Sequence, residues 1–307
     1  MKSRALEIPK GIMGFIDRRA LYIMLLPGII FTIAFAYVPI FGIIMAFQRF
    51  SPVRGFLDSP FVGLDNFTLL FSNFLFWRTV RNTILLSLGK ILFGVFIPIV
   101  LALLLNELTI VRIKKAIQTT LLAPYFLSWA VLAGVLLAVF SIDGLVNSFL
   151  LPMFGSEVSF FTDNSVFPWL LIFTDVWKGM GMNIVIYLAA ITAIDPTLYE
   201  AAEVDGAGYF SKALHITVPS IAPIIMLLLI LSLGSILNAG FEQVFMMYNP
   251  AVYESADIID TFVYRAGIVD LQFSLSAAAG LLKSIVSFLL VCISYFIAYK
   301  FTRYRVL

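Results

Sequence analysis

The chain has 307 residues, of which 61% are hydrophobic and only 12% are charged, and its formal net charge is +2. Soluble globular domains contain roughly 45–50% apolar and ~25% charged residues, so this composition indicates a membrane protein. The small net charge, with no basic run longer than two residues, argues against nucleic-acid binding. Cys292 is the only cysteine and His215 the only histidine, which excludes an intramolecular disulfide and a His-pair metal site.

Six apolar stretches are long enough to cross a bilayer, which takes about 20 residues of helix. The first follows a basic N-terminus, is too long for a signal-peptide core and lacks a cleavage site, so it is interpreted as a retained span. No internal repeat or linker divides the chain. The predicted fold is therefore all-α, one transmembrane domain over residues 1–307 with about six spans, at residues 22–47, 80–105, 116–140, 168–190, 219–237 and 276–300.

Lys and Arg in the connecting segments predict the orientation, because cytoplasmic loops are enriched in them. With both termini in the cytoplasm, the inside segments hold twelve basic residues and the outside loops five. The twelve are Lys2, Arg4, Lys10, Arg18, Arg19, Arg112, Lys114, Lys115, Lys212, Lys300, Arg303 and Arg305. Residues 48–79 and 238–275 are then the large outside loops.

The loop at residues 195–218 breaks this charge pattern, because it is predicted to be cytoplasmic yet is acidic. It reads DPTLYEAAEVDGAGYFSKALHITV and is followed by Pro219. Asp195 can cap a helix that starts at Pro196, and Gly206 permits a sharp break. A second short helix is expected from about residue 209 to 217, stopped by Pro219. We expect a helix–turn–helix on the membrane surface.

Two interpretations of this loop compete. An amphipathic connector resting on lipid headgroups should be basic, because the cytoplasmic leaflet is negative. An acidic loop with small residues fits a protein partner better, since small side chains let the partner approach closely.

The loop resembles the Glu-Ala-Ala signature of permease subunits of binding-protein-dependent ABC importers. Glu200-Ala201-Ala202 is followed by Gly206, Ile216 and Pro219 at the family's spacing. Four other segments resemble sugar-importer permeases of the maltose-type superfamily, in the subgroup that takes up oligosaccharides and polysaccharide fragments: FQRFSPVRGFLDSPFVG at 47–63, FWRTVRN at 76–82, LALLLNE at 101–107 and GFEQVFMMYNP at 240–250. One departure is the absence of a large inserted outer domain, which leaves open how a binding protein is held.

The resemblance implies a type I importer permease in a bacterial cytoplasmic membrane, without enzymatic activity or a bound cofactor of its own. It implies a second, different permease chain, two ATPase subunits that carry ATP and Mg, and an extracytoplasmic solute-binding protein, expected to be a lipoprotein. The acidic loop would be the coupling helix that transmits ATP-driven motion, with alternating access as the mechanism. Its expected coupling residues are Tyr199, Glu200, Ala201, Ala202, Asp205, Gly206, Ala207, Phe210 and Pro219.

The residues themselves show no catalytic motif. The run from Gly89 to Gly94 has two glycines at a suggestive spacing but lacks the Gly-Lys-Ser/Thr ending of a phosphate-binding loop. ATP hydrolysis is therefore expected on another subunit.

Charges inside spans are costly and suggest a function. Asp175 and Lys178 are three residues apart, so they share a helix face and can pair with each other. Lys90 and Lys283 can instead reach the interface if they are shallow. The functional alternative is a polar substrate path with candidates Lys90, Asp175, Trp177, Lys178, Asn183, Tyr187, Asn238, Glu242, Gln243 and Lys283.

The outer segment from about residue 241 to 268 is either an ordered cap or a gate that contacts the binding protein. For the whole chain, the rivals are an ion-coupled secondary transporter, which commonly has an internal repeat, and a membrane enzyme. The sequence does not identify the sugar.

Overall fold

The computed structural model describes residues 10–302, and the surroundings of their side chains from residue 21 to residue 296 apart from Phe154. The basic residues Lys2, Arg4, Arg303 and Arg305, counted above for the orientation, lie outside the described residues. Within that range the chain is helical, with no strand beyond one isolated bridge between Gln48 and Phe61.

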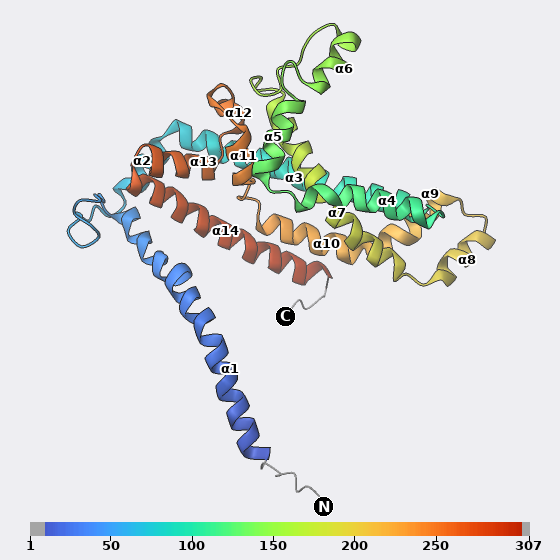
Figure 1. Cartoon of the computed structure of the whole chain (residues 1–307), viewed down its shortest axis with the longest axis horizontal. Coiled ribbons are helices and arrows are strands. Elements are labelled where there is room, and N and C mark those ends of the chain that lie inside the picture. The colour runs from blue at the N-terminus through green and yellow to red at the C-terminus, as the bar shows by residue number, and fades with distance from the viewer. Residues whose placement is uncertain (1–9, 303–307) are drawn as a thin grey trace, which may run out of the picture.

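Four of the predicted spans are confirmed as long apolar helices: α3 (Phe74–Asn106), α7 (Phe167–Thr192), α10 (Val218–Gly234) and α14 (Phe273–Thr302). They run roughly alongside one another and form the body of the molecule (Figure 1). Together with the first span, five helices within residues 10–302 are long and apolar enough to cross a membrane, or six when one bent pair is counted. The all-α class predicted from composition is thereby confirmed.

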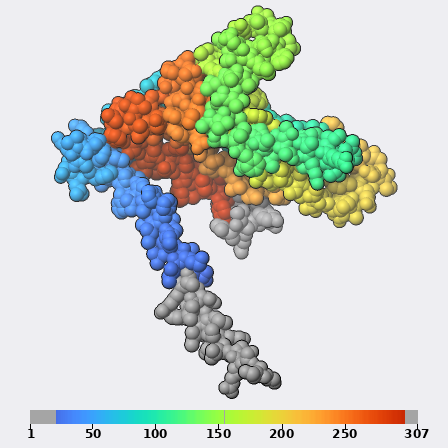
Figure 2. Space-filling model, viewed as in Figure 1, coloured from blue at the N-terminus to red at the C-terminus, as the bar shows by residue number. Residues whose placement is uncertain are grey.

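The first span extends from α1 (Lys10–Thr32) through the π turn η1 (Ile33–Tyr37) into the 3₁₀ segment η2 (Val38–Phe47). It stands off from the body, and only its end near η2 meets α14 (Figures 1 and 2). Nearly all described side chains of this span are exposed apolar groups. In a membrane, lipid or another chain must cover them.

The third predicted span, 116–140, is not one straight helix. The structure divides it into α4 (Val111–Leu122), the 3₁₀ turn η3 (Ala123–Phe126) and α5 (Trp129–Val139), with a bend of 108°. Pro124 lacks a backbone donor, which favours the break, and the Ser128 hydroxyl accepts a hydrogen bond from Val131 N at the start of α5. Beyond α5, the short helix α6 (Leu145–Phe154) projects from the body (Figure 1).

The bundle is held by close contacts between α7 and its neighbours. Gly181 lies so near the backbone of α4 that a Cβ atom there would be 2.3 Å from Leu121 O. Gly89 of α3 faces Ile172 of α7 in the same way, with 2.5 Å to its Cδ1 atom. Glycine at these positions lets the helix axes approach, as small residues do in membrane bundles.

The loop at residues 195–218 forms α8 (Pro196–Val204), a turn at Gly206 with φ +75°, and α9 (Tyr209–Lys212). The expectation that a second short helix stops at Pro219 is wrong. The chain continues from α9 through the π turn η4 (Ala213–Thr217) into α10, so one helix runs from Tyr209 to Gly234. Pro219 is near the start of α10, but because the helix continues from α9 its missing N–H removes a hydrogen bond. The π turn just before it relaxes the hydrogen-bond pattern there.

At the opposite end of the bundle from α8, short elements form a cap. They are α2 (Asp65–Ser72), α11 (Phe241–Met247), η5 (Pro250–Val252), α12 (Tyr253–Ala256), α13 (Ile259–Tyr264) and η6 (Arg265–Val269) (Figure 1).

Candidate functional site

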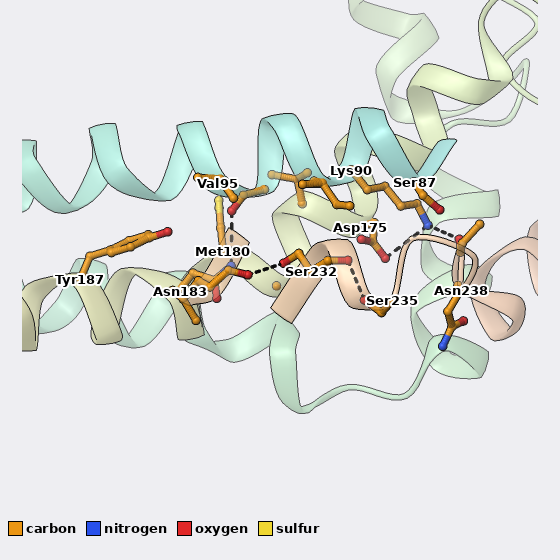
Figure 3. A pocket seen from close by; sticks show the side chains of 17 residues that line it. Ser87, Lys90, Val95, Asp175, Met180, Asn183, Tyr187, Ser232, Ser235 and Asn238 are labelled. Carbon is orange, nitrogen blue, oxygen red and sulfur yellow. Dashed lines mark hydrogen bonds and ion pairs between the residues drawn. The ribbon is translucent and has the colours of Figure 1, made fainter. Parts of the chain in front are cut away.

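A cavity of about 260 Å³ lies between α3, α7, α10 and the unwound segment 235–240. Polar side chains follow its length, from Tyr187 at one end to Asn238 and Lys90 at the other (Figure 3). The side chains and backbone that line it are Ser87, Lys90, Ile91, Gly94, Val95, Asp175, Val176, Gly179, Met180, Asn183, Tyr187, Leu228, Ser232, Ser235, Asn238, Ala239 and Gly240. Five of the ten predicted path residues therefore meet at one site: Lys90, Asp175, Asn183, Tyr187 and Asn238.

Lys90 organises the end of this cavity near Asn238. Its Nζ atom donates to Ala239 O at 2.7 Å and to Gln243 Oε1, and lies 3.5 Å from Asp175 Oδ1. The lysine side chain is only 9% exposed. An ammonium inside a bundle needs a counter-charge and acceptors, and the three partners supply both.

This arrangement fixes the break after α10. Gly240 has φ +86°, a left-handed conformation that suits glycine, and a Cβ atom there would be 3.0 Å from Lys90 Nζ. Gln243 is fully buried and does not line the cavity; its amide donates to Leu171 O at 2.8 Å and to Thr174 Oγ1 at 2.9 Å. Lys90 and Gln243 thus tie the unwound segment to α3 and α7.

The predicted pair of Asp175 with Lys178 does not form. Asp175 turns to Lys90 on α3, whereas Lys178 Nζ donates to Tyr125 O at 3.0 Å. It also lies 5.6 Å from the ring centroids of both Tyr125 and Trp129. Sequence spacing places two residues on one face, but only the neighbouring helices decide which partner each meets. Lys178 therefore contacts residues at the bend between α4 and α5.

Four other candidates lie away from the cavity. Lys283 pairs with Asp260 of α13 at 2.5 Å, so it neither enters the path nor extends to the interface unpaired. Glu242 is exposed in the first turn of α11. Trp177 lines a separate apolar groove with residues of α5. Lys178 is at the bend, as described above.

Three serines of the lining were not predicted from the sequence: Ser87, Ser232 and Ser235. Ser87 lies one helical turn before Lys90, which is the signal that could have found it. Serine is too common in membrane helices for the residue type alone to identify a cavity-lining position.

The second predicted site, the coupling loop, projects from the end of the bundle opposite the cap (Figure 1). Tyr199 and Thr217 join its two arms through their hydroxyls at 2.9 Å, and Lys212 donates to Glu203 Oε1 at 2.7 Å. Val204 is 89% and Phe210 is 78% exposed. The loop is therefore pre-formed, with apolar side chains that the described residues do not cover.

Two ionised carboxylates support this local structure. Asp195 caps α8, and the backbone N–H of Thr197 lowers the pKa of the Asp195 carboxyl below its usual value. The hydrogen bond from Lys212 lowers the pKa of Glu203 in the same direction. Both groups stay charged across the neutral range.

Two curated proteins of Bacillus subtilis (strain 168) are similar to the chain along most of its length. The polygalacturonan/rhamnogalacturonan transport system permease protein YteP is 41% identical over 93% of this chain and 89% of its own. Protein LplB is 40% identical over 92% of this chain and 89% of its own. The chain belongs to the permease family of ABC sugar transporters. No family model matches it.

Solved structures agree with this membership. A bacterial ABC transporter involved in the import of the acidic polysaccharide alginate gives a TM-score of 0.85 and 37% identity, over 95% of this permease and 100% of that chain. A bacterial alginate ABC transporter in complex with alginate pentasaccharide-bound periplasmic protein also gives 0.85, at 36% identity over 96% and 99%. The permease is thus a multi-pass protein of the bacterial plasma membrane.

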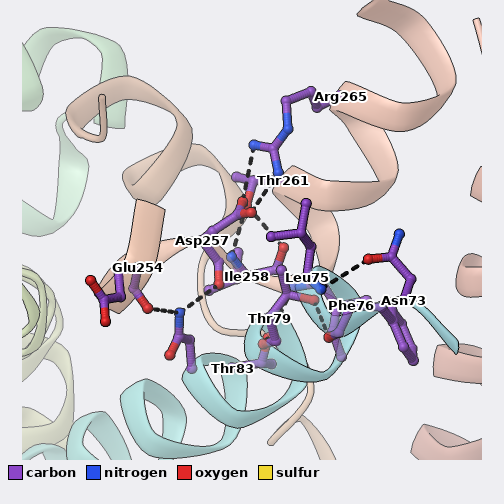
Figure 4. Close-up of polar contacts among 12 residues, drawn as sticks. Asn73, Leu75, Phe76, Thr79, Thr83, Glu254, Asp257, Ile258, Thr261 and Arg265 are labelled. Atoms are coloured by element: carbon purple, nitrogen blue, oxygen red, sulfur yellow. Dashed lines mark hydrogen bonds and ion pairs between the residues drawn. The ribbon is translucent and has the colours of Figure 1, made fainter. Parts of the chain in front are cut away.

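The cap of this permease is locked to α3 by buried polar contacts (Figure 4). Asn82 donates to Glu254 O at 3.0 Å and to Asp257 O at 3.2 Å. Thr83 accepts from Ile259 N at 2.9 Å. The outer segment therefore forms an ordered cap, which was one of its two interpretations. Its contact with a binding protein stays a prediction.

Proposed function

We propose that this permease forms part of the membrane path of an ATP-driven oligosaccharide importer. The observation that carries the proposal is the polar cavity between three apolar spans. Hydroxyl and amide groups such as those of Ser232, Asn183 and Asn238 can exchange hydrogen bonds with sugar hydroxyls. The similar proteins named for polygalacturonan, rhamnogalacturonan and alginate transport support a saccharide of several units.

The loop around α8 would receive the driving force. Its exposed apolar groups, Val204 and Phe210, lie beside small residues that let a partner come close. We assign docking on an ATPase subunit to Tyr199, Glu200, Ala201, Ala202, Asp205, Gly206, Ala207 and Phe210, with Pro219 in the helix that follows. ATP and Mg would be bound by that partner.

The continuous helix from Tyr209 to Gly234 supplies a rigid connection between the two sites. Its 26 residues span roughly 39 Å at 1.5 Å per residue. One end carries the coupling loop, and the other carries Ser232, at the cavity, before the break at 235–240. Contacts of Tyr199 with Thr217 and of Glu203 with Lys212 tie α8 to this helix across the turn at Gly206. Motion of α8 would therefore reach the cavity along this helix, which suits alternating access.

The proposed assembly also contains a second permease chain, a second ATPase subunit and a solute-binding protein outside the membrane. Exposed apolar side chains along the first span are consistent with a cover of lipid and neighbouring protein. The cap formed by α11–α13 would face the binding protein.

The test is import by proteoliposomes that contain the complete transporter with its binding protein. We expect accumulation of oligosaccharide only with ATP, and none when the ATPase subunits carry an inactive phosphate-binding loop. Ionophores that collapse proton and sodium gradients should leave the rate unchanged. Accumulation driven by an ion gradient without ATP would refute the proposal in favour of ion coupling, which the similar proteins do not support.

A further inference from the structure

The charges in the cavity wall are not equally available to a ligand. Lys90 is the only Lys or Arg among the described residues that line the cavity. Its three N–H groups face three acceptors, Ala239 O, Gln243 Oε1 and Asp175 Oδ1, and its side chain is 9% exposed. A ligand could use this ammonium only by breaking the contacts that hold the segment 235–240.

Asp175 is the more open partner of the pair. Its side chain is 34% exposed, and Lys90 lies against Oδ1 alone. No hydrogen bond from the described residues reaches Oδ2. This oxygen can accept a hydrogen bond from a hydroxyl group, and bonds to an ionised acceptor are stronger than neutral ones.

A third group in the wall also lacks a partner. Ser87 is 3% exposed, and its Oγ atom has no hydrogen-bond partner among the described residues. Figure 3 places Ser87 beside Lys90, at the end of the cavity opposite Tyr187. A buried hydroxyl without a partner is costly, so this position suits a ligand hydroxyl or water. The other polar side chains of the lining are uncharged: Asn183, Tyr187, Ser232, Ser235 and Asn238.

We infer that this cavity recognises an uncharged oligosaccharide, with Asp175 as the residue that accepts a sugar hydroxyl and Ser87 as a second contact. The inference rests on the proposed import of oligosaccharides and narrows their class. An acidic sugar would bring its carboxylate towards the open carboxylate of Asp175, and like charges at close range repel. Lys90 is a positioning residue that holds Oδ1 of Asp175 and keeps the break in place.

In the experiment, proteoliposomes contain the complete transporter and its binding protein. They are given a mixture of neutral and uronic oligosaccharides of two to six units. The mixture comes from partial hydrolysis of pectin and hemicellulose, and accumulated sugars are identified by mass spectrometry. We expect the neutral ones to accumulate. To separate this cavity from the binding protein, the purified permease–ATPase complex alone is incubated with the same mixture, and the sugars that it retains are identified.

Two variants then locate the effect. Asp175→Asn should raise the KM for the imported neutral sugar about tenfold or more, because a charged hydrogen bond is lost, and should increase retention of uronides by leaving Lys90 without its counter-charge. Ser87→Ala should raise the KM about two- to tenfold, and it removes no hydrogen bond within the described residues, so we expect the variant to fold. Asp143→Asn, which removes an exposed carboxylate outside the cavity, is the matched control.

Each outcome of these experiments supports or overturns the inference. Uronides imported in preference to neutral sugars overturn the inference while leaving the import function in place. Wild-type KM values in both Asp175→Asn and Ser87→Ala also overturn it. If the wild-type transporter imports neither class with ATP, the proposed function falls and the inference with it. If Asp175→Asn does not assemble, the KM of Ser87→Ala and the identity of the retained sugars still support or overturn the inference.

Discussion

Arg265 holds the carboxylate of Asp257 with both arms of its guanidinium, Nη1 at 3.2 Å from Oδ1 and Nη2 at 2.5 Å from Oδ2 (Figure 4). Asp257 is fully buried, and Thr261 donates to the same Oδ1 at 2.8 Å. Burial by itself lowers the pKa of Arg265, but the hydrogen bonds and the charge of Asp257, with a smaller effect of Tyr248 and Tyr253, together outweigh burial and raise the pKa. Arg265 therefore stays charged at every physiological pH, and its pair with Asp257 anchors the cap.

Replacing Arg265 with Met should lower the free energy of unfolding by about 3–5 kcal/mol, because it leaves the buried Asp257 carboxylate without a counter-charge. The measurement is thermal unfolding of the purified permease. Arg265→Gln combined with Asp257→Asn should lose less than Arg265→Met alone. Arg54→Met, at an exposed arginine, should change little; an equal loss there would mean that the effect is not specific to the pair.

Gly181→Ala should open the contact between α4 and α7, since the new Cβ would be 2.3 Å from Leu121 O, a backbone atom. Overpacking of this kind costs about 1–3 kcal/mol. We expect a lower unfolding temperature and a lower yield of assembled transporter. Gly134→Ala is the matched control, because nothing lies within 4 Å of its Cβ position. A stable Gly181→Ala permease would show that the two helices separate freely.

Gly206→Ala tests the turn between α8 and α9, in the loop proposed to dock on an ATPase subunit. The position has φ +75° and open space around it, so the cost is conformational rather than steric, about 1–2 kcal/mol for an L-residue in the left-handed region. ATP-driven import should fall several-fold, measured together with ATPase binding. Gly208→Ala is the control, since Gly208 has φ −73° and equally open space. Equal import by both variants would contradict a role for the turn in coupling.

Asp195→Ala should loosen the first turn of α8, because Thr197 N loses its acceptor. The carboxyl pKa is lowered in the folded loop. The helix-capping hydrogen bond of Asp195 is therefore fully present above the usual Asp pKa of about 3.9 and is lost only as the pH falls through the lowered value. Amide hydrogen exchange of α8, corrected for intrinsic rates, should be constant between pH 5 and 8 in the wild type and faster in the variant. Wild-type exchange that rises already at pH 5 would contradict the capping role of Asp195.

Span positions were predictable because hydropathy acts along the chain, and α3, α7 and α14 lie within a few residues of the predicted bounds. The 108° bend between α4 and α5 was not. Pro124 signalled only a weak point, and the contact of Lys178 with Tyr125 O at the bend comes from another helix. The passage of the helix through Pro219 was missed because a π turn absorbs the lost hydrogen bond.

The candidate site was half predictable for a similar reason. Polar residues in apolar spans are easy to detect in a sequence, so Lys90, Asp175 and Asn183 were predicted. Which of them pair is a three-dimensional property: Asp175 meets Lys90, which lies 85 positions earlier in the chain. Lys283 looked equivalent to Lys90 but meets Asp260 from the cap instead.

The contact between the first and the last span bears on how the protein is made. Phe50 N, just after the first span, donates to Ser274 Oγ at 2.9 Å, and η2 lies against α14. At a synthesis rate of ~5–20 residues per second, the ribosome needs on the order of 10–50 s to reach Ser274 after Phe50. During that interval the first span waits in the bilayer without its final neighbour. Closure of the bundle is thus a late event in biogenesis. A chain truncated before α14 would hold its N-terminal span through α2, where Asn66 donates to Ala46 O at 2.9 Å, but not through α14, and would leave that span open to quality-control proteases.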